Sequence, residues 1–258
     1  MKTALIGCTG FVGSTLRRST SFDDGFHSTD INRIDGNSYD LIVSAAAPAK
    51  KWLANQKPVE DAAAIDGLIQ HLRTVKANAF VLVSTVDVFQ SPVRVDEQSE
   101  ISLEGLQPYG YNRRRLEIFV REHFELSLIV RLPGLVGPGL RKNIIYDFLN
   151  HNNLDRIDSR HVFQFYPMVN LWTDIQKALK SGLNLVHLTA EPVSVAEVAR
   201  VGFGQNFTQI IDGVTPVRYD FRTLYANLWG REGGAYQYSR EDSLRAICDY
   251  AETEKRTM

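Results

Sequence analysis

Short apolar runs alternate with segments of helical periodicity along the first half of the chain. Runs with the length of buried strands occupy residues 3–6, 40–44 and 79–85. Apolar residues recur at helical spacing from Val59 to Val75, behind Pro58, which suits a first helical turn. Helices are also expected over residues 11–18 and from Pro108. Strands that alternate with helices predict a parallel sheet covered on both faces, the doubly wound α/β fold class.

Three glycines follow the first apolar run with the spacing GxxGxxG. In a strand-to-helix turn, Gly7 permits the sharp turn, Gly10 lets a pyrophosphate approach the backbone, and Gly13 lets the helix pack on the strand. The N–H groups at the helix start would then meet the anion. The spacing is one residue wider at the first gap than the GxGxxG fingerprint, and an ordinary tight turn is the alternative.

The second strand is expected within residues 24–31, a segment that is unusually polar for a buried parallel strand. An acidic side chain at its end would hydrogen-bond the adenosine ribose of NAD, whereas hydroxyl or basic groups would accept the extra phosphate of NADP. Asp30 favours NAD, and Ser28 with Thr29 favours NADP. That all three only cap a loop is a third interpretation.

Small and hydroxyl side chains follow the later strands. Ala45, Ala46 and Ala47 leave room for a flat ligand after the third strand, and Ser84 and Thr85 end the fourth. Ligands of open parallel sheets bind beyond the carboxyl ends of the strands, so these residues are expected to face the site. Simple strand endings are the alternative.

The helix from Pro108 places Tyr109 and Arg113 one turn apart on the same face. A phenol with a pKa of about 10 is a poor base at neutral pH, but a fixed cation and a positive nicotinamide ring favour the phenolate. This pair therefore predicts acid–base chemistry. Tyr111 with Arg115 has the same spacing, but Tyr109 directly follows the proline and precedes a glycine. A solvated basic helix is the alternative.

Composition narrows the classes of partner. Lys and Arg total 29 against 30 Asp and Glu, a net charge of −1, which argues against nucleic-acid binding. Cys8 and Cys248 lie far apart, so no disulfide framework is expected. We also expect no leader, no membrane-spanning segment and no metal site, and therefore a soluble cytoplasmic protein.

Several motifs, taken together and in this order, resemble the extended short-chain dehydrogenase/reductase family of sugar-nucleotide epimerases, dehydratases and reductases. The glycine turn resembles the nucleotide loop of that family, Thr85 its catalytic Ser/Thr, and Tyr109 the tyrosine of its YxxxK motif. Later stretches are similar to its nicotinamide-passing segment, its substrate-closing segment and its late turn; they occupy residues 130–139, 163–175 and 188–195. The resemblance covers nearly the whole chain.

The resemblance implies a Rossmann-like fold with a small C-terminal α/β substrate lobe, in one unit over residues 1–258. The nucleotide-binding part would span about residues 1–135, the lobe mainly about 136–258, and the site would lie between them. It implies an NAD- or NADP-dependent oxidoreductase or epimerase that acts on a hydroxyl or keto group of a sugar or nucleotide sugar. It also implies a homodimer, paired through the helices from Pro58 and Pro108.

The resemblance also implies site residues. Tyr109 would transfer the proton, Thr85 would hold the reacting oxygen, and Arg113 would bias Tyr109 and grip the ribose. Cofactor contacts are expected from Gly7, Thr9, Gly10, Phe11, Val12, Gly13, Asp30, Ala45, Ala46, Ala47, Ser84, Tyr109, Arg113 and Pro133. Substrate contacts are expected from Asp87, Arg131, Arg141 and Asn143, the arginines and asparagine holding a diphosphate unless they are solvated caps.

Two departures from the family pattern bear on activity. Arg113 stands where the family has lysine, and arginine keeps the charge but cannot give up a proton. Val86 stands where the related dehydratases have an Asp acid, although Asp87 matches their Glu base. Only one of the two acid–base residues for dehydration is therefore present. A dinucleotide-binding scaffold without turnover is therefore the rival hypothesis.

Overall fold

The computed structural model describes residues 1–254, which fall into two compact units. Unit 1 contains residues 1–90, 99–131 and 171–186, and unit 2 contains the remaining described residues. Each unit is described by itself below. None of the helices in the described residues is both long and apolar enough to cross a lipid bilayer.

A six-stranded parallel sheet with the strand order β10-β6-β4-β3-β1-β2 forms the centre of unit 1. Its strands are β1 (Thr3–Ile6), β2 (Asp24–Phe26), β3 (Ser38–Ser44), β4 (Lys76–Thr85), β6 (Ser127–Leu132) and β10 (Leu185–His187). β1 pairs with β2 on one side and with β3 on the other, so the direction of the strand order reverses there. This reversal is a topological switch point, where open α/β sheets bind ligands. The predicted α/β fold class is confirmed.

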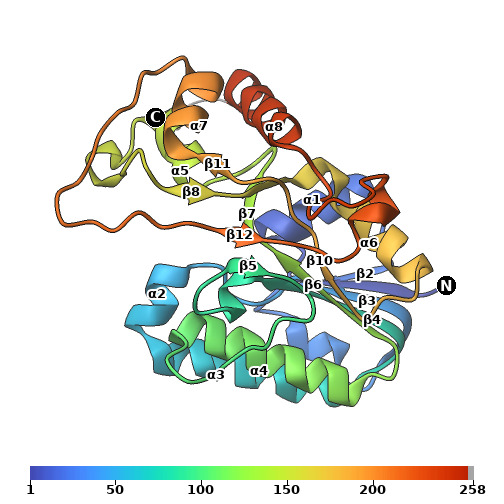
Figure 1. The fold of residues 1–258 in the computed structure, drawn as a ribbon. Coiled ribbons are helices and arrows are strands. Elements are labelled where there is room, and N and C mark those ends of the chain that lie inside the picture. The colour runs from blue at the N-terminus through green and yellow to red at the C-terminus, as the bar shows by residue number, and fades with distance from the viewer. Residues whose placement is uncertain (255–258) are drawn as a thin grey trace. The chain divides into compact units, whose positions relative to one another are not determined.

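Helices cover both faces of this sheet (Figure 1). α3 (Pro58–Leu72) and α4 (Pro108–His123) pack side by side on one face, and α1 (Phe11–Ser19) packs with α6 (Leu171–Lys180) on the other. The expected helices after the glycine turn and from the two prolines are therefore present. The sequence did not predict α2 (Lys51–Gln56), a six-residue helix that contacts both α3 and α4.

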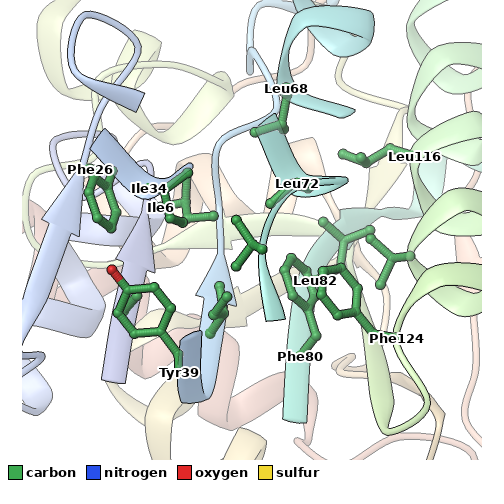
Figure 2. Packing of buried hydrophobic residues seen from close by; sticks show 14 of the residues in the cluster. Ile6, Phe26, Ile34, Tyr39, Leu68, Leu72, Phe80, Leu82, Leu116 and Phe124 are labelled. Atoms are coloured by element: carbon green, nitrogen blue, oxygen red, sulfur yellow. The ribbon is translucent and has the colours of Figure 1, made fainter. Parts of the chain in front are cut away.

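The core under α3 and α4 accounts for their apolar spacing. Leu68 and Leu72 of α3 and Leu116 of α4 point toward Phe80 and Leu82 of β4 (Figure 2). Each such side chain contributes about 1.5–3 kcal/mol when it is buried. The amphipathic pattern of the sequence thus places α3 and α4 on the sheet.

The second strand lies within the expected segment; it is three residues long and ends at Phe26, four residues before Asp30. The following segment turns instead into the 3₁₀ helix η1 (Ile31–Ile34). Its polar side chains satisfy one another locally: the His27 backbone N–H donates to Asp30 Oδ1 at 2.7 Å, and Thr29 Oγ1 lies 2.8 Å from His27 Nδ1. These local hydrogen bonds compete with strand pairing.

Unit 2 combines three helices with three two-stranded sheets. The helices are α5 (Ile144–Asn150), α7 (Val195–Phe203) and α8 (Arg240–Thr253), and the sheets pair β5 (Val93–Val95) with β12 (Asp220–Phe221), β7 (Gly134–Val136) with β9 (Phe165–Pro167), and β8 (Val162–Phe163) with β11 (Val193–Ser194). Four short 3₁₀ helices complete the described elements: η2 (Val86–Val88) in unit 1, and η3 (Leu154–Arg156), η4 (Met168–Asn170) and η5 (Ala226–Trp229) in unit 2.

The two units are interleaved along the chain, with one division after Arg131. Residues 171–186 belong to unit 1, because α6 packs on α1 and β10 extends the sheet beside β6. Residues 91–98 belong to unit 2, because β5 pairs with β12. The chain therefore passes between the two units several times.

Candidate active site

The glycine turn at the end of β1 has the geometry that a phosphate loop needs. Gly7 has a positive φ of +82°, and a Cβ on Gly13 would lie 2.1 Å from the Gly7 carbonyl oxygen. A Cβ on Gly10 would meet nothing closer than that oxygen, at 3.5 Å. Gly10 also directly precedes α1, whose first turn contains no acidic residue. The turn is thus tight at its two ends, and space remains above Gly10 beside helix N–H groups that can bind an anion.

The end of β3 adjoins this turn. A Cβ on Gly7 would lie 2.4 Å from the Ala45 carbonyl oxygen, and the Ala45 N–H donates to Ile6 at 2.8 Å. The three alanines of residues 45–47 are half-buried, so they line this strand end without filling it. Thr9 is exposed, and both Phe11 and Val12 are half-buried.

Two hydroxyls at the end of β4 point in different directions. Ser84 Oγ donates to Glu117 Oε1 at 2.6 Å and thereby contacts α4. Thr85 caps the short 3₁₀ helix η2, since its Oγ1 accepts from the Asp87 backbone N–H at 3.1 Å. Successive strand residues face opposite sides of a sheet, which explains the difference. Both residues are half-buried, and the catalytic role expected of Thr85 and the cofactor contact expected of Ser84 stay predictions.

Tyr109 is held at the first turn of α4, close to η2. A Cβ on Gly110 would lie 2.0 Å from the Asp87 carbonyl oxygen, so only glycine permits this approach of helix and loop. The Tyr109 backbone N–H donates to Asn55 Oδ1 of α2 at 3.0 Å. Helix α4 therefore brings Tyr109 to the carboxyl end of β4, where Thr85 lies.

Arg113 is buried among partners from three segments. Its side chain is 2% exposed; Nη1 pairs with Asp61 of α3 and Nη2 donates to the Pro48 carbonyl oxygen. Nη1 also lies 3.2 Å from the Tyr109 carbonyl oxygen, and Asn112 Nδ2 donates to Asp61 at 2.8 Å. The planar guanidinium reaches a carboxylate and carbonyls at once, which a lysine ammonium does not do in the same geometry. The expected grip of Arg113 on a ribose is therefore at odds with this packing.

Burial, and not the neighbouring cation, dominates the protonation of Tyr109. Desolvation raises the pKa of the Tyr109 phenol above its usual value, although the charge of Arg113 opposes the rise. The charge of Arg113 thus lowers the pKa of Tyr109 in the expected direction, but the desolvation of the phenol raises this pKa by more. Asp61 neutralises Arg113 and adds to the rise in pKa.

Arg131 belongs to a buried network and does not suit the expected substrate contact. Its Nε and Nη2 donate to the two carboxylate oxygens of Glu117 at 2.9 and 2.8 Å, and its side chain is 2% exposed. Glu117 also accepts from Ser84 and from Arg114. A bidentate pair of this kind is strong and directional, so it joins α4 to β4 and β6 instead of binding a diphosphate.

The expected contacts beyond β6 lie in unit 2. Asn143 caps α5: its Oδ1 accepts from Ile145 N at 2.9 Å and its Nδ2 donates to the Leu135 carbonyl oxygen at 2.9 Å. Its amide thus has a structural role, as the cap interpretation expects. Arg141 is exposed. Pro133, the residue that links β6 to β7 in the sequence, is buried. Their expected substrate and cofactor contacts stay predictions.

Asp30 has local partners for its carboxylate. Oδ1 accepts from the His27 N–H at 2.7 Å, and Oδ2 lies 3.4 Å from Arg33 Nη1. A carboxylate paired in this way is a weaker argument for NAD than the sequence pattern implied. The exposed Arg33 is a basic group of the kind that accepts the phosphate of NADP.

Sequence patterns missed several residues that build this site. Lys51 Nζ lies 2.7 Å from Asp87 Oδ1, and Asn55 and Asp61 hold Tyr109 and Arg113. Lys51 and Asn55 lie on α2, which is too short to show a periodic pattern. Asp61 looks like an ordinary acidic residue in a first helical turn, where such residues are common.

Protein-family models and curated proteins contain no match to this sequence, but solved structures match along 98% of the chain. UDP-glucose 4-epimerase from Thermotoga maritima with UDP-glucose is 14% identical, with a TM-score of 0.73 over 99% of its own chain. dTDP-4-dehydrorhamnose reductase from Bacillus anthracis in complex with NADP is 17% identical, with a TM-score of 0.73 over 100% of its chain. UDP-glucuronic acid 4-epimerase from Bacillus cereus in complex with NAD is 17% identical, with a TM-score of 0.71 over 99% of its chain.

These neighbours are members of the extended short-chain dehydrogenase/reductases, and the fold of this chain is the one they share. The likeness in fold extends over the whole length of both chains, which accords with the resemblance carried by the sequence motifs. At this level of identity it defines the architecture, and the chemistry must be argued from the residues of the site.

Proposed function

We propose that this protein is an NAD- or NADP-dependent oxidoreductase or epimerase that acts on a hydroxyl or keto group of a nucleotide sugar. One observation supports the proposal: in unit 1 the open glycine turn follows β1 and Thr85 ends β4 of one parallel sheet, with β3 between these strands, and Gly110 rests against Asp87 beside Tyr109. A dinucleotide fits this edge, because the space above Gly10 and the N–H groups of α1 suit a pyrophosphate. When bound, it would supply or accept the hydride.

Tyr109 moves the proton in this proposal. Because burial raises its pKa, the phenol is protonated at neutral pH and is ready to donate to the oxygen of a keto group. Thr85 Oγ1, whose contact to Asp87 Oδ2 is a long 3.4 Å, can hydrogen-bond that same oxygen. Oxidation of a hydroxyl requires the reverse transfer, so Tyr109 must first lose its proton.

Arg113 orients Tyr109 and does not transfer protons. The guanidinium carbon lies 3.9 Å from the centroid of the Tyr109 ring, within the range of a cation–π contact. Since Asp61 and Pro48 hold the same guanidinium, the ring has a fixed platform. This arrangement keeps the tyrosine in place without the family lysine.

The substrate class is the finer part of the proposal. Neighbours of the same fold are crystallised with UDP-glucose or named for dTDP- and UDP-linked sugars. The exposed Arg141 in unit 2 is the remaining candidate from the expected basic cluster for a diphosphate. A homodimer through α3 and α4 is supported by exposed Val59 and Tyr111 on those helices. The homodimer and the cytoplasmic location stay predictions.

A screen with nucleotide sugars tests this function. UDP- and dTDP-linked 4-keto sugars are incubated with NADH or NADPH, and oxidation of the nicotinamide is followed by absorbance. For epimerisation, UDP-glucose and UDP-galactose are incubated with NAD and separated by chromatography. The proposal expects turnover with at least one sugar and its loss in Tyr109→Phe. Turnover that persists in this variant would remove Tyr109 from the mechanism.

The rival function is a dinucleotide-binding scaffold without turnover. The pairing of Arg113 with Asp61 and the raised pKa of Tyr109 favour it, because both leave the phenol poorly placed to act as a base. Arg113→Lys separates the two functions. A gain of activity in this variant over an inactive wild type supports the scaffold, whereas an active wild type excludes it.

A further inference from the structure

The short helix α2 contacts both segments that carry the candidate catalytic residues. Lys51 Nζ, in its first turn, donates to Asp87 Oδ1 at 2.7 Å. Asn55, one turn later, accepts the backbone N–H of Tyr109 at 3.0 Å. Residues four apart lie on one face of a helix, so a single face of α2 is directed at Tyr109 and Asp87.

Asp87 connects this lysine to the candidate substrate-binding hydroxyl. Thr85 Oγ1 accepts from the Asp87 backbone N–H at 3.1 Å and lies 3.4 Å from Asp87 Oδ2. The Asp87 carbonyl oxygen rests against Gly110, the residue that follows Tyr109. The carboxylate thus lies between the Lys51 ammonium and the Thr85 hydroxyl, at the start of α4.

Four charged side chains act on Tyr109, one from each element packed around it: Arg113 from α4, Asp61 from α3, Asp87 from η2 and Lys51 from α2. The side chains of Arg113 and Asp61 are 2% and 3% exposed, whereas those of Lys51 and Asp87 are 46% and 19% exposed. Arginine holds its proton throughout, whereas lysine can release one. Of the two ion pairs, Lys51–Asp87 is therefore the one that reaches the solvent.

We propose that the Lys51–Asp87 ion pair sets the protonation of Tyr109, with Lys51 as a positioning residue on a helix outside the YxxxR segment. The proposal deepens the function proposed above and rests on Tyr109 being its acid–base group. During reduction, a bound nicotinamide would supply the hydride to the carbonyl carbon, the phenol gives its proton to the keto oxygen, and the Lys51 ammonium stabilises the phenolate that remains. A proton taken up from the bulk solvent then restores the phenol.

The two members of the pair act on Tyr109 with opposite signs. The positive charge of Lys51 lowers the pKa of the phenol, and the negative charge of Asp87 raises it. Loss of Lys51 should therefore raise this pKa, and loss of the Asp87 charge should lower it. A purely structural role would not produce opposite shifts, because either change would loosen the same packing.

Fluorine NMR measures these pKa shifts in the apo protein, with its tyrosines replaced by fluorotyrosine. The phenol of fluorotyrosine is more acidic than that of tyrosine, so the titration is followed while the protein stays folded. The Tyr109 resonance is assigned by its absence in Tyr109→Phe. We expect a higher pKa in Lys51→Met, a lower pKa in Asp87→Asn, an intermediate value in the double variant and a near wild-type value in Lys51→Arg. Lys57→Met is the matched control, since Lys57 lies at the other end of α2 and pairs with the exposed Glu60.

Shifts of the same sign in Lys51→Met and Asp87→Asn, or no shift in either, would overturn the proposal. If Lys51→Met does not fold, Lys51→Gln replaces it in the comparison with Asp87→Asn, with the same expected rise in the pKa of Tyr109. The titration needs no turnover, so a failure of the proposed function is seen separately, as absent hydride transfer in the wild type. In an active enzyme, Lys51→Met should lower turnover at neutral pH roughly tenfold, whereas Lys57→Met should leave it unchanged.

Discussion

The guanidinium carbon of Arg113 lies 3.9 Å from the centroid of the Tyr109 ring, and the same guanidinium is paired with Asp61. Arginine therefore stabilises the position of the tyrosine through its ring face, while its own charge is compensated inside the protein. The usual lysine of this fold combines orientation of the tyrosine with proton exchange. In the mechanism we propose, the two tasks fall to different residues of this chain.

Tyr109→Phe should lower turnover about 100-fold or more, because the phenol that donates the proton is lost. Phenylalanine keeps the ring on Arg113, so dinucleotide affinity and the unfolding midpoint should stay near wild type. Tyr111→Phe is the control, since Tyr111 lies on the same helix and is 40% exposed. Steady-state kinetics measure the turnover of both variants. Equal turnover in Tyr109→Phe and Tyr111→Phe would contradict the role of Tyr109.

Arg113→Met should lower the free energy of unfolding by about 3–5 kcal/mol, because it leaves the buried Asp61 carboxylate without its cationic partner. The double variant Arg113→Met/Asp61→Leu should recover most of this loss, since neither charge then remains buried. The control is Arg115→Met, whose partner Asp66 is 48% exposed, with an expected loss below about 1 kcal/mol. Urea unfolding measures all three. A loss as small as that of the control would show that the pair is dispensable.

Gly10→Ala should weaken dinucleotide binding about tenfold or more while leaving the fold intact. The added Cβ meets no atom closer than 3.5 Å, so it fits the protein but occupies the space needed by the pyrophosphate. Gly67→Ala is the matched control: its Cβ meets nothing within 4 Å on α3 and should add about 0.5–1 kcal/mol of stability. Calorimetric titration with the dinucleotide compares the affinities of the two variants. Unchanged affinity in Gly10→Ala would place the pyrophosphate elsewhere.

Asp158→Asn should destabilise the protein at neutral pH but not in acid. Hydrogen bonds from Arg160, followed by the Ile211 N–H, hold the pKa of Asp158 well below its usual 3.8. The pKa of Asp158 is lower in the folded protein than in the unfolded chain. The stabilisation that its charge provides is therefore present above the pKa of the unfolded chain and is lost as the pH falls through the pKa of the folded protein. The gap between the urea midpoints of the variant and wild type should therefore narrow progressively as the pH falls below ~4. Asp155→Asn, at an 80% exposed position, is the control and should show no pH-dependent gap.

The elements of unit 1 follow from local patterns in the sequence. Pro58 and Pro108 begin helices where the apolar spacing predicts them, and the glycines behave at Gly7 and Gly13 as their spacing indicates. These signals are local, since each depends on a few neighbouring residues. A strand, a turn and a helix start can therefore be assigned from the sequence.

The partners of the site residues could not be assigned in that way. In the sequence, Arg131 is a candidate for binding a diphosphate. In the structure its guanidinium is paired with Glu117, fourteen positions earlier in the sequence. The pairing of Asp61 with Arg113 joins two helices 52 residues apart. Such long-range contacts leave no periodic trace, because they depend on how α3 and α4 pack on the sheet.

The proposed enzyme is tested most directly by a calorimetric titration of the wild-type protein with NAD, NADH, NADP and NADPH. We expect saturable binding of one oxidised and reduced pair, with NADPH binding tightest if Arg33 contacts the phosphate and NADH if Asp30 contacts the ribose. Binding of none of the four would rule out the proposed enzyme, because the glycine turn would then be a structural turn and the protein would lack its hydride carrier.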